Sequence, residues 1–389
     1  MGKDPMTGLD ARGMRQANAA ALLGILHDTG GSISLAALAA RTGLSRRTVE
    51  LILGSLEADG WVSAPGQELH ASGRGRPARL FEFRPAAGAV LAIDVEHDRS
   101  TAQVTDLRGR PLGKAVTVIS GEPDRTDRLD LTRAAVTDVL SEIGLTAGHI
   151  GAVAIATPGN VDDDGLVAAD LSMRGWRGVD LRAELCVGFD CPVVVENNAK
   201  LAMLAELWEG AAVGADHMLW LMLEGVHNGM GILVNGAPYR GVQGAAGEIS
   251  WATGLGLDAL AESPLNGLGR LQSRQRQLAA HDLVGRARAG EADALAVVDE
   301  FAATLVRALS TLSWVLAPRF IVLGGTLSHA VGELLVSRVA QLLDGQAPDF
   351  VELRLSQLGP DAVLRGAVRS ALGSFDWASR SALGRRFGA

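Results

Sequence analysis

Polar and basic side chains open an amphipathic segment between residues 45 and 58. Apolar residues at positions 49, 52, 53 and 56 recur with helical spacing, which predicts a helix with one buried stripe. Side chains on the other face at its start could form hydrogen bonds with phosphates and base edges. They are Ser45, Arg46, Arg47, Thr48 and Glu50. These residue types at this spacing indicate contact with double-stranded DNA.

Two more arginines alternate with glycine at residues 73–76, within the segment Ser-Gly-Arg-Gly-Arg-Pro. Arg74 and Arg76, at a flexible tip, would suit a narrow minor groove with its enhanced negative potential. Taken singly, Arg46 and Arg47 could be a solvated helix face, and the Arg-Gly segment could be a soluble turn. Their combination in this order favours DNA binding.

The neighbouring elements predict how these side chains are positioned. Residues 18–27 read as a helix, Ser34 can cap a second helix over 35–42, and Gly43 begins a turn. Ser45 then caps the third helix, which is the order of a helix-turn-helix whose last helix enters the major groove. Residues 61–63 and 78–83 look like two strands of a wing, so we expect a winged helix-turn-helix over residues 1–84.

Composition excludes several classes of protein. The 389 residues are 48% hydrophobic, which is too apolar for a disordered chain. No apolar run is long enough to span a membrane, and the start has no apolar core of a signal peptide. Two cysteines cannot make a disulfide framework. We therefore expect a cytoplasmic protein that does not associate with membranes.

The net charge of −8 at first argues against nucleic acid, which normally selects a basic surface. The charge is unevenly spread. Residues 1–84 hold ten basic and eight acidic residues, a balance of +2, and the other 305 residues carry −10. Because phosphate contacts need local positive charge, this asymmetry is compatible with a DNA-binding domain and a chemically different body.

An internal repeat predicts two similar α/β lobes. Residues 88–120 and 216–242 both read as strand, loop, strand and a turn rich in Gly and Pro, about 127 residues apart. Short apolar strands at 150–156, 192–195 and 319–323 alternate with helices. A helix over 301–316 carries leucines near one face, for core or dimer packing, and we favour core. Two such lobes around a cleft are typical of the actin-like, sugar-kinase architecture.

The ordered motifs of the body resemble the ROK family of repressors and sugar kinases. The motifs are Ala-Thr-Pro-Gly-Asn-Val-Asp at 156–162, Gly-Trp at 175–176, Val-Glu-Asn-Asn-Ala at 195–199, Asn-Gly-Met-Gly-Ile at 228–232, Gly-Val-Gln-Gly at 241–244, Ala-Gly-Glu-Ile at 246–249, Leu-Gly-Gly-Thr at 323–326 and Leu-Gly-Pro-Asp-Ala at 358–362. The resemblance spans about residues 15 to 375. It implies an α/β fold with a winged helix-turn-helix over 1–84 and a two-lobed actin-like (sugar-kinase, ribonuclease-H-like) ROK domain over 85–389. Lobe one would comprise about 85–198 plus a C-terminal helix from about 365, and lobe two about 199–364.

The resemblance also implies that kinase chemistry is lost. Family kinases end their first strand with Asp-x-Gly-x-Thr, which meets the nucleotide phosphates, whereas this chain has Glu96 in place of the glycine and Asp98 in place of the threonine. Their catalytic base is the Asp of Glu-Asn-Asp, and here that position is Asn198, whose amide cannot take a proton. We expect no enzymatic activity, and an active sugar kinase is the alternative that these residues oppose.

Family members usually carry a zinc site made from one histidine and three cysteines. Here Trp251 takes the histidine position and residues 253–260 contain no cysteine. Cys186 and Cys191 lie upstream and are expected in the core. We therefore expect no metal and no cofactor, and the loop over about 251–268 must be held by packing or be mobile.

The resemblance assigns the cleft a small-molecule effector, a sugar or derivative. Its matching positions are Gly159, Asn197, Asn198, Glu248 and Trp251. Trp251 could stack on a pyranose face or simply fill the pocket, and Glu248 could be a charge satisfied within a glycine-rich turn. The expected protein is a DNA-binding transcriptional regulator, a repressor, acting as a homodimer or dimer of dimers on a palindromic operator. A constitutive DNA-binding factor with a vestigial cleft is the rival.

Overall fold

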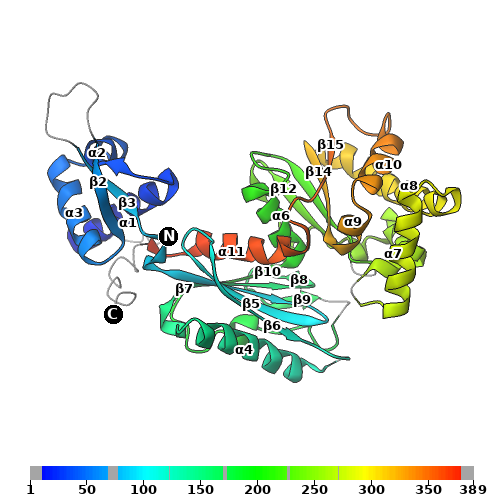
Figure 1. The fold of residues 1–389 in the computed structure, drawn as a ribbon, viewed down its shortest axis with the longest axis horizontal. Coiled ribbons are helices and arrows are strands. Elements are labelled where there is room, and N and C mark those ends of the chain that lie inside the picture. Colours follow the sequence, from blue (N-terminus) through cyan, green and yellow to red (C-terminus); the bar gives the residue numbers. More distant parts are fainter. Residues whose placement is uncertain are drawn as a thin grey trace, which may run out of the picture.

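The N-terminal part of the computed structural model is a small helical unit with a three-stranded sheet, here called the head (Figure 1). The structure describes residues 11–68, 78–121, 123–169, 173–225, 228–269 and 271–377. The head comprises α1 (Ala11–Thr29), β1 (Ile33–Ser34), α2 (Leu35–Thr42), α3 (Arg46–Ala58), β2 (Val62–Glu68) and β3 (Ala78–Phe83). Its strand order is β1-β3-β2, so the predicted winged helix is confirmed. Strand β1 is an additional strand, and α1 begins seven residues before the predicted helix.

Local signals set the ends of the head helices as predicted. The Ser34 hydroxyl accepts a hydrogen bond from Ala37 N at 3.3 Å and starts α2. Gly43 then adopts a left-handed conformation (φ 71°), which ends that helix and forms the turn. Ser45 starts α3 by accepting from Thr48 N at 3.1 Å. The predicted stripe of α3 is buried, namely Val49, Ile52, Leu53 and Leu56.

Lobe one is built on a five-stranded sheet in the order β10-β7-β4-β5-β6. After the turn η1 (Pro85–Ala87) come β4 (Ala89–Val95), β5 (Arg99–Asp106), β6 (Pro111–Val118), α4 (Arg125–Glu142), η2 (Ala147–His149), β7 (Ile150–Thr157) and β10 (Val193–Asn197). The short pair β8 (Asn160–Val161) and β9 (Val167–Ala169) and the helix α5 (Leu181–Leu185) lie between β7 and β10 in the chain. Every residue of β4 and β7 is buried, as continuous apolar runs in a covered sheet predict.

Lobe two repeats this plan with the order β13-β12-β11-β14-β15. Its strands are β11 (Met218–Met222), β12 (Gly229–Val234), β13 (Ala237–Pro238), β14 (Phe320–Gly324) and β15 (Glu352–Leu355). In each lobe an antiparallel meander of three strands continues into two parallel strands, so the predicted duplication is confirmed. The helices of lobe two are α7 (Arg274–Arg288), α8 (Ala292–Leu316), α9 (Gly325–Val331) and α10 (Glu333–Leu343). Leu305 and Leu309 of α8 are buried in the core, as we favoured.

The loop over about residues 251–268, which the sequence predicted to be either held by packing or mobile, is held by packing. Residues 242–268 form five short turns, η3 (Val242–Gly244), η4 (Ile249–Trp251), η5 (Thr253–Leu255), η6 (Leu257–Glu262) and η7 (Pro264–Leu268), and η8 (Gly359–Asp361) follows β15. Leu257, Leu260, Leu265 and Leu268 are buried in the core of lobe two. Four apolar side chains therefore hold this loop against the core of lobe two.

Two helices cross between the lobes (Figure 1). They are α6 (Asn198–Glu209), which packs on the lobe-two strands β11 and β12, and α11 (Ala362–Ser374), which packs on the lobe-one strands β4 and β7. The two helices approach each other at Gly366, where an added Cβ would stand 1.8 Å from Leu201 O. Glycine at this position therefore lets the helices touch backbone to backbone.

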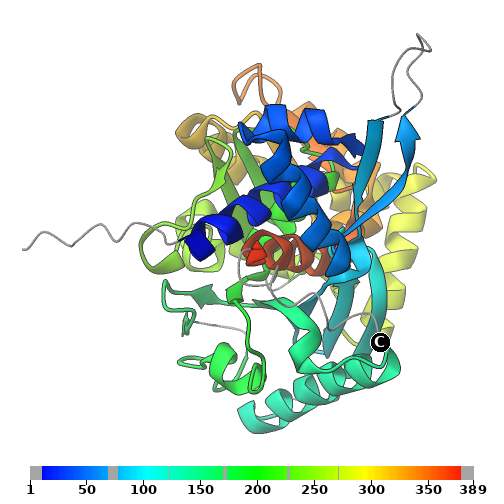
Figure 2. The same cartoon turned by 90° about the vertical axis from the view of Figure 1, so that its left-hand side faces the viewer.

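The head is packed against lobe one through a shared core (Figure 2). Trp377, just after α11, packs in tilted and edge-to-face geometry against the rings of His27, Phe83 and Phe375 at centroid distances of 5.4, 5.7 and 4.7 Å. His27 also has its Nε2 2.9 Å from Leu107 O in lobe one. Phe375 and Trp377, just after α11, thus lie between the head and the body.

Candidate functional site

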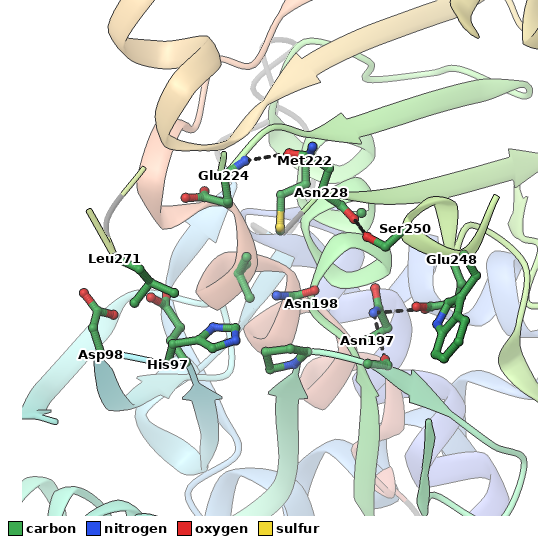
Figure 3. Close-up of a pocket in the computed structure, with 16 residues that line it drawn as sticks. His97, Asp98, Asn197, Asn198, Met222, Glu224, Asn228, Glu248, Ser250 and Leu271 are labelled. Atoms are coloured by element: carbon green, nitrogen blue, oxygen red, sulfur yellow. Dashed lines mark hydrogen bonds between the residues drawn. The ribbon is translucent and has the colours of Figure 1, made fainter. Parts of the chain in front are cut away.

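A pocket opens between the two lobes at the carboxyl ends of their central strands (Figure 3). Parallel pairing aligns Asp94 of β4 with Ala156 of β7, and Thr157 with Asn197 of β10, so the segments that follow these strands meet at one edge. All five positions expected for an effector line this pocket: Gly159, Asn197, Asn198, Glu248 and Trp251. Residues 159, 197 and 248 are thus neighbours in space although they span 90 positions in sequence.

Asn197 organises the back of the pocket. Its Oδ1 accepts from Ala199 N at 2.9 Å and Lys200 N at 3.2 Å, which caps α6. Its Nδ2 donates to Gly159 O at 2.9 Å and to Glu248 Oε1 at 3.3 Å (Figure 3). Both lone pairs and both amide hydrogens are in use. Asn197 therefore holds the Gly159 loop and the Glu248 carboxylate in place.

Asn198 stands at the first position of α6 and lines the pocket beside Asn197. Its Oδ1 accepts from Ala199 N at 2.8 Å. An amide here can hydrogen-bond a hydroxyl group, but it cannot remove its proton, because it has no basic site near neutral pH. The side chain can therefore bind a polyol without activating it.

The loop after β4 contributes Glu96, His97 and Asp98 to the opposite wall. Arg99 ties this loop together, with its Nη2 2.7 Å from Asp98 Oδ2 and its Nε 3.6 Å from Glu96 Oε2. Arg128 of α4 is buried and donates to the carbonyls of Glu96 and His97. The loop is thus fixed from behind by two arginines and presents acidic side chains to the pocket.

Lobe two supplies further lining residues that sequence reasoning did not select, namely Met222, Glu224, Asn228, Ser250 and Leu271. Asn228 Oδ1 accepts from Glu224 N at 3.2 Å, and the Ser250 hydroxyl donates to Asn228 O at 2.9 Å. Glu224 Oε1 accepts from Thr326 N at 2.8 Å. The duplication could have indicated Glu224, since it follows β11 as Glu96 follows β4.

A buried lysine and an arginine lie behind the pocket. Lys200 is 2% exposed and its ammonium donates to Gly244 O. Burial lowers the pKa of Lys200 below its usual value, and the nearby carboxylates of Glu196 and Glu248 oppose that shift. Arg240, of lobe two, reaches Glu196 Oε2 at 2.7 Å and Asp163 Oδ1 at 2.8 Å in lobe one. Arg240 therefore joins the two lobes at the rear of the pocket, whereas Lys200 ties α6 to the turn η3 within lobe two.

Trp251 and the cysteines stand far apart in the fold. Trp251 lines the pocket with its side chain 56% exposed, whereas Cys186 is buried in the core of lobe one and Cys191, partly exposed, packs against that core. Burial raises the pKa of the Cys186 thiol to about 12, which keeps it protonated and a poor metal ligand. Within the ranges that the structure describes, no three His, Cys, Asp or Glu side chains gather as a metal site. The absence of bound metal stays a prediction.

The DNA-binding candidates occupy the start of α3, on the side of the head turned away from the body (Figure 1). Arg46, Arg47 and Glu50 are exposed. Ser45 and Thr48 serve the helix end, since the Ser45 hydroxyl caps Thr48 N and lies 2.8 Å from the Thr48 hydroxyl. Arg74 and Arg76 lie outside the described residues. Of the candidates on α3, two arginines and one glutamate are therefore exposed and available for contact with DNA.

A winged helix joined to two matching α/β lobes around a polar cleft defines a DNA-binding head on an actin-like body. The chain belongs to the ROK family, whose model matches residues 90–373, and residues 17–65 match the IclR helix-turn-helix domain. Among the described helices, none has the length and apolarity needed to cross a membrane.

Both repressors and kinases are similar to this chain. It is 27% identical over 350 residues to the xylose repressor of Bacillus subtilis (strain 168), covering 86% of this chain and 89% of that protein. It is 32% identical over 248 residues to a glucokinase of Halalkalibacterium halodurans, covering 55% of this chain and 74% of that protein. The crystal structure of a ROK family transcriptional regulator, a homologue of the E. coli Mlc protein, matches with a TM-score of 0.70 at 19% identity, covering 97% and 100%. At 19% identity, this structural similarity supports the assignment of the fold alone.

Proposed function

We propose that this ROK-family protein is a sequence-specific DNA-binding repressor whose body senses a sugar-like molecule without transforming it. We divide it into a DNA-binding head, residues 1–84, and a two-lobed body, residues 85–389. The observation that carries this proposal is the position of α11 between the cleft and the head. Val363 in its first turn lines the cleft, and Phe375 and Trp377, just after its last residue, pack on the head. A ligand that changes lobe closure would move this helix and with it the head.

The lining of the cleft favours binding over phosphoryl transfer. Asn198 stands where a kinase needs a carboxylate, and Glu96 and Asp98 bring negative charge to the loop that would hold nucleotide phosphates. The relatives include kinases, so the test must measure activity directly. We infer that the protein is not an enzyme.

We infer that the effector is an unphosphorylated polyol. Four carboxylates line the pocket, from Glu96, Asp98, Glu224 and Glu248, and its described lining includes no lysine or arginine, although Arg99 behind the wall pairs with those of Glu96 and Asp98. Such a wall repels a phosphate group but accepts hydrogen bonds from sugar hydroxyls. Trp251 adds a flat apolar surface on which a pyranose face can stack.

We further propose a homodimer, because two-fold related heads match the palindromic half-sites of most operators. A regulator of this kind acts where the chromosome lies, so we propose a cytoplasmic location. Sedimentation of the full chain with and without operator DNA tests the dimer.

The function is tested by selecting an operator from random duplex DNA with the full chain, and then titrating it with a panel of free sugars and their phosphates. We expect one or more free sugars to change operator affinity and raise the melting temperature, and the phosphates to do neither. Trp251→Ala should weaken that response about tenfold or more while leaving the fold intact, because the side chain is mostly exposed. Trp314→Ala is the matched control, because Trp314 on α8 is exposed and does not belong to the described lining of the cleft.

Three outcomes would overturn parts of this proposal. Operator affinity indifferent to every sugar would indicate a vestigial cleft. Consumption of ATP in the presence of hexoses would indicate a kinase. Failure to enrich any DNA sequence would remove the DNA-binding function itself.

A further inference from the structure

The face of α3 that is turned away from the core has a definite centre. A helix advances about 100° per residue, so the positions opposite the buried stripe can be assigned. They are Arg47, Leu51, Gly54 and Ala58, and all four are exposed. Arg46 and Glu50 are exposed too, but they lie towards one flank of this face. The centre of the face is therefore different from the polar cluster that the sequence alone singles out.

Leu51 is the unexpected member of this face. Its side chain is 69% exposed, whereas the four other branched apolar residues of α3 are buried in the core of the head. It lies one helical turn after Arg47, about 6 Å further along the axis. A large apolar side chain thus occupies the middle of the surface that a helix-turn-helix inserts into the major groove.

Gly54, one turn after Leu51, leaves room for a close approach. Glycine is among the least favourable residues inside a helix, and the fold does not require it here. A Cβ at Gly54 would meet no atom within 4 Å, and its backbone is not left-handed. The space that this glycine frees lies on the outer side of the helix, where a duplex would enter.

The major groove offers one apolar group, the 5-methyl of thymine, while guanine presents O6 and N7 to an arginine. Positive charge at Arg46 and Arg47 is complementary to the phosphates on either side of the groove. Building on the proposed function, we propose that Leu51 determines specificity by contacting a thymine methyl group. Arg47 donates to a guanine about two base pairs away, and Arg46, on the flank, contacts a phosphate.

The test replaces single thymines by deoxyuridine in the operator selected with the full chain. This change removes the methyl group and leaves base pairing intact. For the wild type we expect one thymine per half-site whose replacement lowers affinity about three- to fivefold, the effect of losing one buried methyl contact. Leu51→Ala should bind the thymine operator about as weakly and should be insensitive to deoxyuridine at that position.

The variants separate this role from a structural one. Leu51→Ala should fold normally, since Leu51 is exposed and alanine is an equally good helix former. Leu278→Ala, a 62% exposed leucine on α7, should keep the wild-type response to deoxyuridine. Arg47→Ala should relax the preference for guanine, whereas Arg46→Ala should weaken all sequences alike.

The outcomes distinguish this inference from the function on which it rests. If no operator can be selected, both fail. If an operator is selected but the wild type and Leu51→Ala respond equally to deoxyuridine at every position, DNA binding stands and the role of Leu51 is refuted.

Discussion

Lys200 carries an ionisable group into the protein interior. Its ammonium lies behind the cleft, hydrogen-bonded to Gly244 O and near the carboxylates of Glu196 and Glu248. Taking an ammonium group out of water is costly, and the lowered pKa of Lys200 expresses that cost. The lysine joins α6 to the turn η3, so it positions lobe-two backbone beside the pocket between the lobes.

The pH dependence of stability should report this burial. The pKa of Lys200 is lower in the folded than in the unfolded protein, so between the two values the unfolded chain binds more protons. The free energy of unfolding contributed by Lys200 therefore rises with pH in that window, by at most about 1.4 kcal/mol per pH unit, and below the folded pKa its cost is fully present.

Melting temperatures of the wild type and Lys200→Met between about pH 7 and pH 10 test this, because the variant keeps the volume and loses the titration. We expect the melting temperature of the wild type to rise relative to that of Lys200→Met as the pH rises. Parallel curves would show that Lys200 keeps its ordinary pKa in the folded protein.

The Cys186 thiol should be inert in the native protein. Burial raises its pKa to about 12, and the reactive thiolate form is then very rare at neutral pH. Alkylation followed by mass spectrometry should label Cys186 only after unfolding, whereas the partly exposed Cys191 provides the internal comparison. Equal labelling of Cys186 in native and unfolded protein would contradict the burial.

At the scale of elements, the crossing of α6 and α11 is the joint between the lobes. Gly366→Ala would place a Cβ 1.8 Å from Leu201 O, and neither helix backbone can yield without losing its contacts with the sheets. We expect a loss of about 2–3 kcal/mol in the free energy of unfolding, measured by denaturant titration. Gly373→Ala, near the end of the same helix, would contact only the flexible end of Arg369 at 3.4 Å and should be neutral or slightly stabilising. Equal effects of the two variants would refute this account.

At the scale of the molecule, the aromatic cluster around Trp377 connects the head to α11, whose first turn lines the cleft through Val363. The cluster joins His27, Trp61 and Phe83 of the head to Phe375 and Trp377 after α11. Trp377→Ala should leave operator binding and effector binding each measurable. In the wild type we expect the effector to change operator affinity about 5- to 150-fold, and in the variant this ratio should fall towards one. Gel-shift titrations with and without effector measure this ratio.

Trp314→Ala, on α8 of lobe two, is the control for that experiment because its side chain is exposed and donates its indole N–H to Gln346 O within the same lobe. Unchanged coupling in Trp377→Ala would show that the signal reaches the head by another route. Loss of operator binding without any effector would instead show that the cluster only supports the fold of the head.

The sequence by itself determined what depends on neighbouring residues. Caps at Ser34, Gly43 and Ser45 fixed the helix-turn-helix, because a helix end is satisfied by side chains within three residues of it. The repeated strand pattern predicted two lobes of the same topology. The residue types at positions 96, 198 and 251 carry the predictions that phosphoryl transfer and a zinc site are absent, because chemistry depends on the group present, and both stay predictions.

Tertiary structure decided what depends on distant residues. Asn197 joins Gly159 to Glu248, and Lys200 meets Gly244, through contacts that separate α/β segments bring together and no local pattern encodes. The head shares its core with Phe375 and Trp377, nearly 300 residues further along the chain than Phe83. Burial of one stripe of α3 left Leu51 at the centre of the opposite, exposed face, so packing rather than polarity located the surface that we propose contacts the bases.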